Sequence, residues 1–338
     1  MAGTKKLDDA PRNYYDLLEV SSRARAEVVE AAYKTLIKIF HPDKPTGDEN
    51  KARALNEAYK IISDSASRAD YDRAGKKLRG KVVGAYRILE EIAEGGFGTT
   101  YKGEHVFTGM PVCIKHCHEI SPQDEEILLN EAKSAWELRH FSIPVMRDLL
   151  KLDDGSLALV MSYIPGPTLA QVVEKNGSLD PEHVAWIAER VINVLKYMHY
   201  NGVIHGDIKP QNIIVQPESH MVVLVDFGLS MIKPTAKSES KGFTPLFAPP
   251  EQISGQTLIP ESDFFSLGTT MMYALSGKTS CVEKREVPDD TPDALCEFIR
   301  RLVVRNPLDR PNWSKEDLFE TISKVRQKAF GRNHSNMK

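Results

Sequence analysis

The 338-residue sequence predicts an α+β protein: an all-α N-terminal module, then a larger module rich in strands at first and in helices afterwards. Three observations favour this fold class. Apolar residues recur at helical spacing within residues 13–75, and short strand-like segments around turns begin at Tyr86. The stretch Phe264–Gly277 carries no charge and is too short to span a bilayer, which suits a buried helix.

Composition places the chain among folded proteins, with 41% hydrophobic and 27% charged residues. The net charge of −3 gives no reason to expect nucleic acid or a membrane as partner. Four cysteines are too few for a disulfide framework, and Met1–Arg12 lacks the apolar core of a signal peptide. We therefore expect a cytoplasmic protein. The net charge is +3 over residues 1–80 and −6 over the rest, which suggests two modules.

Residues 13–75 are predicted to form an antiparallel helical hairpin closed by short helices at Tyr14–Leu18 and Ser67–Gly75. Two apolar stripes follow helical spacing, one at Val29, Ala32, Tyr33, Leu36 and Phe40, the other at Leu55, Ala58, Tyr59 and Ile62. Pro42 ends the first helix because it disfavours helical geometry at His41. A tail, residues 1–12, precedes the module. The linker Lys76–Ala85 follows it and spans about 35 Å at most.

Four motifs occur in order in this first module: Tyr14-Tyr15-Asp16-Leu17-Leu18, Phe40-His41-Pro42-Asp43-Lys44, Asn56-Glu57-Ala58-Tyr59 and Arg68-Ala69-Asp70-Tyr71-Asp72. His-Pro-Asp alone would be an ordinary interhelical turn. Together the four motifs closely resemble a J-domain, the DnaJ-like module. The resemblance implies docking on a DnaK-type heat-shock chaperone and stimulation of its ATP hydrolysis, through Lys34, Lys38, His41, Pro42 and Asp43.

The expected docking face departs from the family pattern. Glu30, Ala31, Thr35 and Ile39 stand where the family often has basic residues, which implies weak docking. Neither a Gly/Phe-rich segment nor a CxxC zinc module follows, so a general substrate-binding DnaJ chaperone is not expected.

The second module, residues 86–325, starts with predicted strands at Tyr86–Ile92, Thr99–His105 and Pro111–His116. The turn between the first two, Ala93–Gly98, is glycine-rich and can bring backbone amides to an anion, although most such turns are plain hairpin turns. A helix-like stretch at Ile127–His140 and a buried strand at Leu157–Tyr163 follow. Residues 326–338 are a C-terminal tail.

Further motifs follow in a fixed order: Val112-Cys113-Ile114-Lys115, Glu131, His205-Gly206-Asp207-Ile208-Lys209-Pro210-Gln211-Asn212, Asp226-Phe227-Gly228, Pro249-Pro250-Glu251, Asp263-Phe264-Phe265-Ser266-Leu267-Gly268 and Arg310-Pro311. The module as a whole resembles a eukaryotic-type protein kinase domain. The resemblance implies a two-lobed fold, with a β-rich small lobe and an α-rich large lobe, that uses ATP and Mg²⁺ on a protein substrate.

The resemblance also implies a role for each matching residue. Lys115 pairs the nucleotide's α- and β-phosphates and is held by Glu131. Asp207 accepts the proton of the substrate hydroxyl, and Lys209 steadies the transferring phosphate. Asn212 and Asp226 hold Mg²⁺, which prefers oxygen ligands.

The ATP contacts implied in the same way are Ile92, Gly95, Gly96, Gly98, Thr100, Lys115, Met161, Tyr163 and Ile164, with Met161 at the gatekeeper position. Glu251 and Arg310 are expected to form a structural ion pair, and Asp263 to brace the catalytic loop. Lys209 and Thr244-Pro245 resemble the Ser/Thr-specific branch.

Four features depart from the kinase pattern. Ala93 replaces the first glycine of the phosphate loop, and Thr100 replaces the usual Val. Gly206 replaces the Arg that commonly pairs with an activation-loop phosphate, which argues against activation by that switch. The substrate-docking helix expected before Pro288 is predicted to be shortened or missing.

Two other functions stay open on the sequence. One is a catalytically weak or inactive pseudokinase scaffold that acts as a J-domain co-chaperone adaptor. The other is a small-molecule kinase, disfavoured by the intact segment Thr244–Glu251. A zinc site at Cys113, His116, Cys117 and His118 is not expected because successive side chains on a strand point to opposite faces. A Walker-type site at Gly277-Lys278-Thr279 is rejected because Met272 stands where its first glycine belongs.

Overall fold

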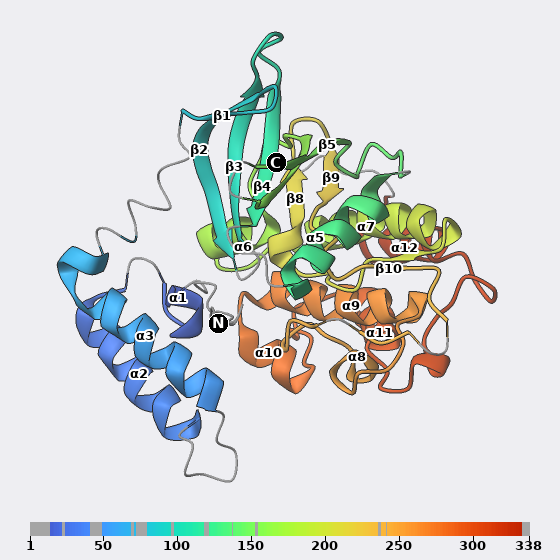
Figure 1. Ribbon diagram of the computed structural model, residues 1–338. Helices are drawn as coiled ribbons and strands as arrows, with labels where there is room; N and C mark the ends of the chain where they lie inside the picture. Colours follow the sequence, from blue (N-terminus) through green and yellow to red (C-terminus); the bar gives the residue numbers. More distant parts are fainter. Residues whose placement is uncertain are drawn as a thin grey trace. The chain divides into compact units, whose positions relative to one another are not determined.

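The computed structural model describes residues 14–21, 24–40, 49–68, 71, 80–95, 98–117, 122–136, 138–152, 155–235, 238–240 and 242–332. It confirms the α+β class: a helical region, then a six-stranded sheet, then a second helical region (Figure 1). The chain divides into two compact units, residues 1–126 with 148–161 and residues 127–147 with 162–338.

The N-terminal helices are α1 (Tyr14–Leu17), α2 (Ala26–Phe40) and α3 (Glu49–Ser63), and residues 65–68 are also helical. Helices α2 and α3 lie side by side, as the predicted hairpin requires (Figure 1). Their apolar stripes meet in a core that includes Leu18, Val29 and Leu55, each without exposed surface. The rings of Tyr33 and Tyr59 stack at 4.1 Å across the hairpin. Apolar stripes facing each other therefore hold this region together.

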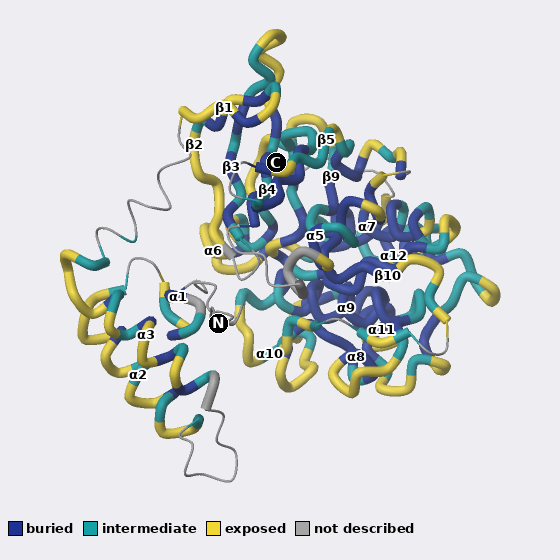
Figure 2. The backbone as a smooth tube through the Cα atoms, in the orientation of Figure 1, coloured by how far each residue is buried: buried dark blue, intermediate teal, exposed yellow. Residues whose placement is uncertain are grey.

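The sheet has the strand order β1-β2-β3-β4-β6-β5. Its strands are β1 (Val82–Val83), β2 (Tyr86–Gly95), β3 (Gly98–His105), β4 (Pro111–Cys117), β5 (Met146–Lys151) and β6 (Leu157–Ser162). Tyr101 pairs with Ile114, and Ile88 with Gly103, so large side chains fill one face. Figure 2 shows buried and half-buried stretches along β3 and β4. Strand β2 runs beyond the predicted end at Ile92 because Gly95 still pairs with Gly98.

The second unit is mainly helical. Its helices are α5 (Pro122–Trp136, which begins in the first unit), α6 (Leu169–Asn176), α7 (Pro181–Tyr200), α8 (Pro250–Ile253), α9 (Pro260–Ser276), α10 (Thr279–Lys284), α11 (Asp293–Leu302) and α12 (Leu318–Phe330), with 3-10 turns η2 (Pro210–Asn212) and η3 (Pro307–Asp309). Short strands pair as β7 (Val203–Ile204) with β10 (Met231–Ile232), and β8 (Ile213–Gln216) with β9 (Met221–Leu224).

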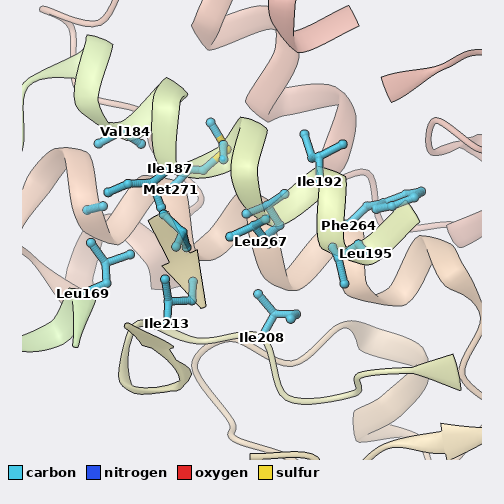
Figure 3. Packing of buried hydrophobic residues seen from close by; sticks show 14 of the residues in the cluster. Leu169, Val184, Ile187, Ile192, Leu195, Ile208, Ile213, Phe264, Leu267 and Met271 are labelled. Carbon is cyan, nitrogen blue, oxygen red and sulfur yellow. The ribbon is translucent and has the colours of Figure 1, made fainter. Parts of the chain in front are cut away.

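Helix α9 is the centre of the large core. It begins one turn before the predicted Phe264 and ends before Gly277, which adopts the left-handed conformation at φ +66°. Figure 3 shows Phe264, Leu267 and Met271 of α9 among side chains of α7. Ile208, which directly follows Asp207, reaches into the same core (Figure 3). The core thus anchors the chain immediately beside a predicted catalytic residue.

Two predicted helices can be compared with the structure in detail. The helix expected at Ile127–His140 is α5, and it ends at Trp136. The Arg139 guanidinium donates to the carbonyl oxygen of Trp136 at 2.7 Å, which satisfies a helix-end acceptor in place of another turn. Before Pro288, the six-residue helix α10 occupies the interval. Of the two outcomes predicted for this interval, a shortened or a missing helix, the structure shows the first.

Candidate active site

The loop between β7 and β8, residues 205–212, is held from one side by Asp263 of α9. The Asp263 carboxylate accepts the backbone N–H groups of His205 and Gly206, both at 2.8 Å. Gly206 has φ +73°, and a Cβ there would lie 2.7 Å from the carbonyl oxygen of Leu229. Only glycine fits this position without strain or displacement of Leu229.

A chain of hydrogen bonds continues from Asp263 to α7 and beyond. The indole N–H of Trp313 can only donate, so Nδ1 of His199 accepts it, at 2.9 Å. The proton of His199 therefore lies on Nε2, which donates to Asp263 Oδ2 at 2.8 Å. Burial alone would raise the pKa of Asp263, but the hydrogen bonds from the His199 side chain and from the backbone N–H of Gly206 lower it. The loop is thus braced by a fixed carboxylate.

Asp207 lies in a set of three donors. The Asn212 amide donates to Asp207 Oδ2 at 2.9 Å, and the Lys209 ammonium lies 2.7 Å from the same oxygen. The Thr244 hydroxyl donates to Oδ1 at 2.8 Å and accepts from Lys209 at 3.0 Å. A carboxylate offers about four acceptor positions, so these three donors orient it and leave room for one more hydroxyl.

Asn212 and Asp226 are brought together by the β8–β9 hairpin. Ile213 pairs with Leu224, and the carbonyl oxygen of Asn212 accepts the N–H of Val225 at 3.0 Å, so Asp226 follows at once. The amide nitrogen of Asn212 serves Asp207, which leaves its amide oxygen for a cation. That oxygen and the Asp226 carboxylate are the kind of ligand that Mg²⁺ takes, usually together with water and phosphate oxygens. The residues fit such an ion.

Helix α5 places Glu131, which is 1% exposed, beside the turn Asp226–Gly228. A Cβ on Gly228 would lie 3.4 Å from Asp226 Oδ1 and 3.9 Å from Glu131 Oε2. Asn130 donates to the carbonyl oxygen of Ser230 at 2.7 Å, which ties α5 to the same turn. Within this unit, a hydrogen bond and close packing therefore join α5 to the Asp226 segment.

The first unit carries most of the remaining predicted nucleotide residues, and Tyr163 and Ile164 belong to the second. Cross-strand pairs align Ala93, Thr100 and Lys115 across β2, β3 and β4, on the face opposite the core. Gly98 has φ +130°, and a Cβ there would lie 2.1 Å from the carbonyl oxygen of His116. Ile92 is 48% exposed, and Met161 is half-buried on β6.

The other predicted ATP contacts stand as follows. Gly95 ends β2, Tyr163 and Ile164 follow β6 and are half-buried, and Gly96 lies outside the described residues. The pairing of Lys115 with Glu131 stays a prediction.

Other predicted residues are placed clearly. Arg310 binds Glu251 through two contacts, Nη1 to Oε1 at 2.7 Å and Nη2 to Oε2 at 2.9 Å, and both residues are buried. On α2, Lys34 lies exposed and forms an ion pair with Glu30 at 2.6 Å, and Lys38 is exposed. The segment His41-Pro42-Asp43 lies outside the described residues.

Alternation along β4 puts Cys113 and Cys117 on one face and His116 on the other, where His116 contacts Ser156 at 2.8 Å. His118 lies outside the described residues.

Sequence reasoning missed four residues around Asp207. The sequence identified Thr244 as a mark of the Ser/Thr-specific branch, but not its hydrogen bond to Asp207, which lies 37 residues away in the chain. Gln252, which contacts Gly206, stands beside the Pro249-Pro250-Glu251 motif without any pattern of its own. His199 and Trp313 read as ordinary helix and loop residues. Their spacing gave no signal, because these contacts form only in the folded chain.

Comparisons with known proteins agree with this geometry. The model for the protein kinase domain matches residues 86–328, and the model for the DnaJ domain matches residues 13–72. Serine/threonine-protein kinase B of Synechocystis is 32% identical over 227 residues, which cover 61% of this chain and 38% of that protein. Serine/threonine-protein kinase pkn3 of Myxococcus xanthus is 30% identical, covering 67% and 47% respectively.

A third relative, serine/threonine-protein kinase PrkC of Bacillus subtilis, is 28% identical over 67% of this chain and 34% of its own length. The chain thus spans less than half the length of these three relatives. In the described part of the chain, no helix is both long and apolar enough to cross a membrane.

Proposed function

Because the chain belongs to the protein kinase domain family and carries a DnaJ domain ahead of it, we propose that it is a serine/threonine protein kinase that also recruits a DnaK-type chaperone. The kinase part of the proposal rests above all on Asp207. Its carboxylate is oriented by Asn212, Lys209 and Thr244 and has room for the hydroxyl of a substrate.

Each of these groups has a task that phosphoryl transfer requires. Asp207 accepts the proton of the attacking hydroxyl, and Thr244 and Asn212 keep its two oxygens in place. The Lys209 ammonium lies 2.7 Å from Asp207 and puts positive charge where the transferred phosphoryl group arrives. Mg²⁺, held by Asn212 and Asp226, would neutralise phosphate charge when bound.

The sheet supplies the ATP-binding part of the proposal. Lys115 shares a face with Thr100 and Ala93, on the side of the sheet that the core does not fill. Gly98 admits no side chain, which suits a loop whose backbone approaches phosphate. We assign ATP binding to this face together with Ile92, Gly95, Gly96 and Met161. The ATP contacts of Tyr163 and Ile164 and the role of Glu131 toward Lys115 stay predictions from the resemblance.

Specificity for serine and threonine is supported by the Lys209–Thr244 hydrogen bond, which joins the loop of Asp207 to the segment before Pro249. It is also supported by the names of the relatives, all serine/threonine-protein kinases. The substrate class we propose is therefore a protein with an accessible serine or threonine.

The test of the kinase is Mg²⁺-dependent transfer of labelled γ-phosphate from ATP to peptides that differ only in carrying serine, threonine or tyrosine. The whole protein is expected to label the serine and threonine peptides. Asp226→Asn is expected to raise the Mg²⁺ concentration that gives half-maximal phosphate transfer, because it removes a charged ligand of the ion. A folded protein that transfers nothing to any peptide would favour a pseudokinase scaffold instead.

The chaperone part of the proposal rests on the DnaJ domain match and on the exposed Lys34 and Lys38 of α2. Because Glu30 pairs with Lys34, the positive charge that this face offers to an acidic partner is reduced, and weak, salt-sensitive docking is expected. The whole protein should accelerate ATP hydrolysis by a DnaK-type chaperone, and His41→Gln should abolish that effect. A rate equal for both proteins would contradict recruitment through this domain.

A further inference from the structure

Gln252 of α8 joins two segments that shape the surroundings of Asp207. Its side chain is almost fully buried, at 2% exposure. Its amide nitrogen donates to the carbonyl oxygen of Gly206 at 2.7 Å and to that of Gly242 at 2.9 Å. Gly206 directly precedes Asp207, and Gly242 lies two residues before Thr244. One amide group therefore connects the catalytic loop to the activation segment, residues 226–251.

Both hydrogens of that amide are used, one on each carbonyl oxygen. Without Gln252 the carbonyl of Gly206, itself in a buried residue, would lose this donor, and such a loss is unfavourable away from water. The catalytic loop and the activation segment would then lose the hydrogen bonds through which Gln252 joins them. Thr244, which orients Asp207, would be the first group to be displaced.

The conformation of Gly206 explains why an uncharged group joins the catalytic loop to the activation segment. We call the two hydrogen bonds of the Gln252 amide the Gln252 clamp. The positive φ and the 2.7 Å approach to Leu229 would strain an arginine at this position or displace Leu229. In a kinase domain that has an arginine there, its charge can hold a phosphorylated activation segment. Here the backbone of Leu229 occupies the space instead, so the segment packs directly against the loop.

Further contacts between uncharged groups attach the described part of the activation segment. Met231 pairs with Ile204 in the β7–β10 ladder, and both pack on Leu258. The Thr257 hydroxyl lies 2.5 Å from the carbonyl oxygen of Ser238 and 3.2 Å from that of Thr235. The segment is thus held near its beginning, middle and end by hydrogen bonds and apolar contacts.

We propose that Gln252 is a positioning residue for Asp207, which keeps the activation segment in its working arrangement without phosphorylation. The inference rests on the proposed kinase function, since it names how that site is regulated. It predicts a kinase whose activity does not depend on a phosphate in residues 226–251.

Kinetics of the whole protein provide the first test. Gln252→Leu keeps the approximate size of the side chain and removes the donor. It is expected to lower kcat about tenfold to a hundredfold and to change the KM for ATP less than about twofold. Gln256→Leu, the same substitution at an exposed glutamine four residues on, should leave both constants unchanged. Treatment of the wild type with a phosphatase should also leave them unchanged.

Gln252→Glu gives a signature that a merely structural role would not give. An ionised carboxylate only accepts hydrogen bonds and would repel the two carbonyl oxygens, whereas the protonated acid can donate to one of them. The activity of Gln252→Glu relative to wild type should therefore rise as the pH falls from about 8 to about 5. The same ratio for Gln252→Leu should stay constant over that range.

Amide hydrogen exchange of the whole protein tests the clamp without any activity measurement. Residues 242–249 should exchange faster in Gln252→Leu than in wild type, and at the wild-type rate in Gln256→Leu. If wild type transfers no phosphate, the proposed function fails, and exchange alone decides whether the clamp exists. The inference is overturned if Gln252→Leu keeps wild-type exchange, or keeps wild-type kcat in an active kinase. It is also overturned if phosphatase treatment removes the activity or the protection of wild type.

Discussion

At the scale of single residues, the large unit depends on buried charges whose partners are all close. The Arg310 guanidinium donates two hydrogen bonds to the Glu251 carboxylate, and the Ser262 hydroxyl donates to the same carboxylate at 2.8 Å. A buried ion pair of this kind contributes little more to stability than a well-packed apolar pair would. Removal of one partner, however, leaves the other charge buried without a partner, which is strongly destabilising. Such residues should therefore be sensitive to substitution.

Arg310→Ala is expected to lower the free energy of unfolding of the large unit by about 3–5 kcal/mol, because it leaves Glu251 buried without its cation. Denaturant unfolding followed by tryptophan fluorescence measures this, since Trp136, Trp186 and Trp313 all lie in that unit. Lys324→Ala is the control, because Lys324 pairs with Glu320 on the surface. Similar losses for the two variants would contradict the argument from burial.

His205 should make stability depend on pH. Burial lowers its pKa below the ordinary 6.5, more than the charges of Asp263, Asp207 and Asp226 raise it. Below about pH 6.5 the unfolded chain therefore binds a proton that the folded chain does not, so the folded state loses stability as the pH falls. The lowered pKa of Asp263 adds a second loss at more acidic pH, below its unfolded value of 3.8.

His205→Asn should flatten the decline of unfolding free energy between about pH 6.5 and pH 5, because it removes the titrating group. The control is His220→Asn, at an exposed histidine with φ +52°, a conformation that asparagine tolerates. Denaturant midpoints across this pH range measure both variants. A slope that His205→Asn leaves unchanged would assign the pH dependence to other groups.

At the scale of elements, the ends of α6 and α9 fit together through two glycines. A Cβ on Gly277 would lie 1.4 Å from the carbonyl oxygen of Gly177, so the helix ends touch backbone to backbone. The N–H of Leu179 donates to the carbonyl oxygen of Ala274 at 2.9 Å beside this contact. The position of α9 therefore depends on the absence of a side chain at its C-terminus.

Gly277→Ala should destabilise the large unit by more than Gly331→Ala. Both glycines end helices with φ near +70°, but a Cβ on Gly331 meets nothing within 4 Å. The loss of stability in Gly331→Ala therefore measures only the cost of the left-handed backbone conformation, about 1–2 kcal/mol. The additional loss in Gly277→Ala measures the steric contact with Gly177. Equal melting temperatures for the two variants would show that α6 and α9 can move apart freely.

Much of the arrangement of elements could be predicted from the sequence, because periodicity and ordered motifs carry it. The apolar stripes predicted the α2–α3 hairpin, and the uncharged stretch after Asp263 predicted the core of α9. The end of α5 could not be predicted, since a side chain of Arg139 closes it. The Thr244 and Gln252 contacts with the catalytic loop could not be predicted either, because they join segments far apart in the sequence.

At the scale of the whole molecule, each hydrophobic cluster is built from its own part of the sequence. Among the described residues, the core of α1 to α3 draws on residues 14–71, and the core around α9 on residues of the second unit. Leu55 and Leu267 are both buried, each in one of these cores. We therefore expect the helical N-terminal region and the large unit to unfold independently of each other.

Leu55→Ala and Leu267→Ala test that independence. Each removes a buried side chain and should cost its own core about 2–5 kcal/mol. Only Leu267→Ala should shift the fluorescence transition of the three tryptophans, whereas Leu55→Ala should shift the helical signal in circular dichroism alone. A fluorescence transition that moves in both variants would mean that the two regions unfold together.

The central claim is that Asp207 is the general base of a phosphoryl transfer. The most direct measurement is kcat for transfer from ATP to a serine peptide at saturating ATP and Mg²⁺, for the whole protein and for Asp207→Asn. Asparagine keeps the shape and cannot accept the proton, so kcat should fall about 10²- to 10⁴-fold while the KM for ATP changes little. A kcat for Asp207→Asn within about twofold of wild type would contradict this role of Asp207.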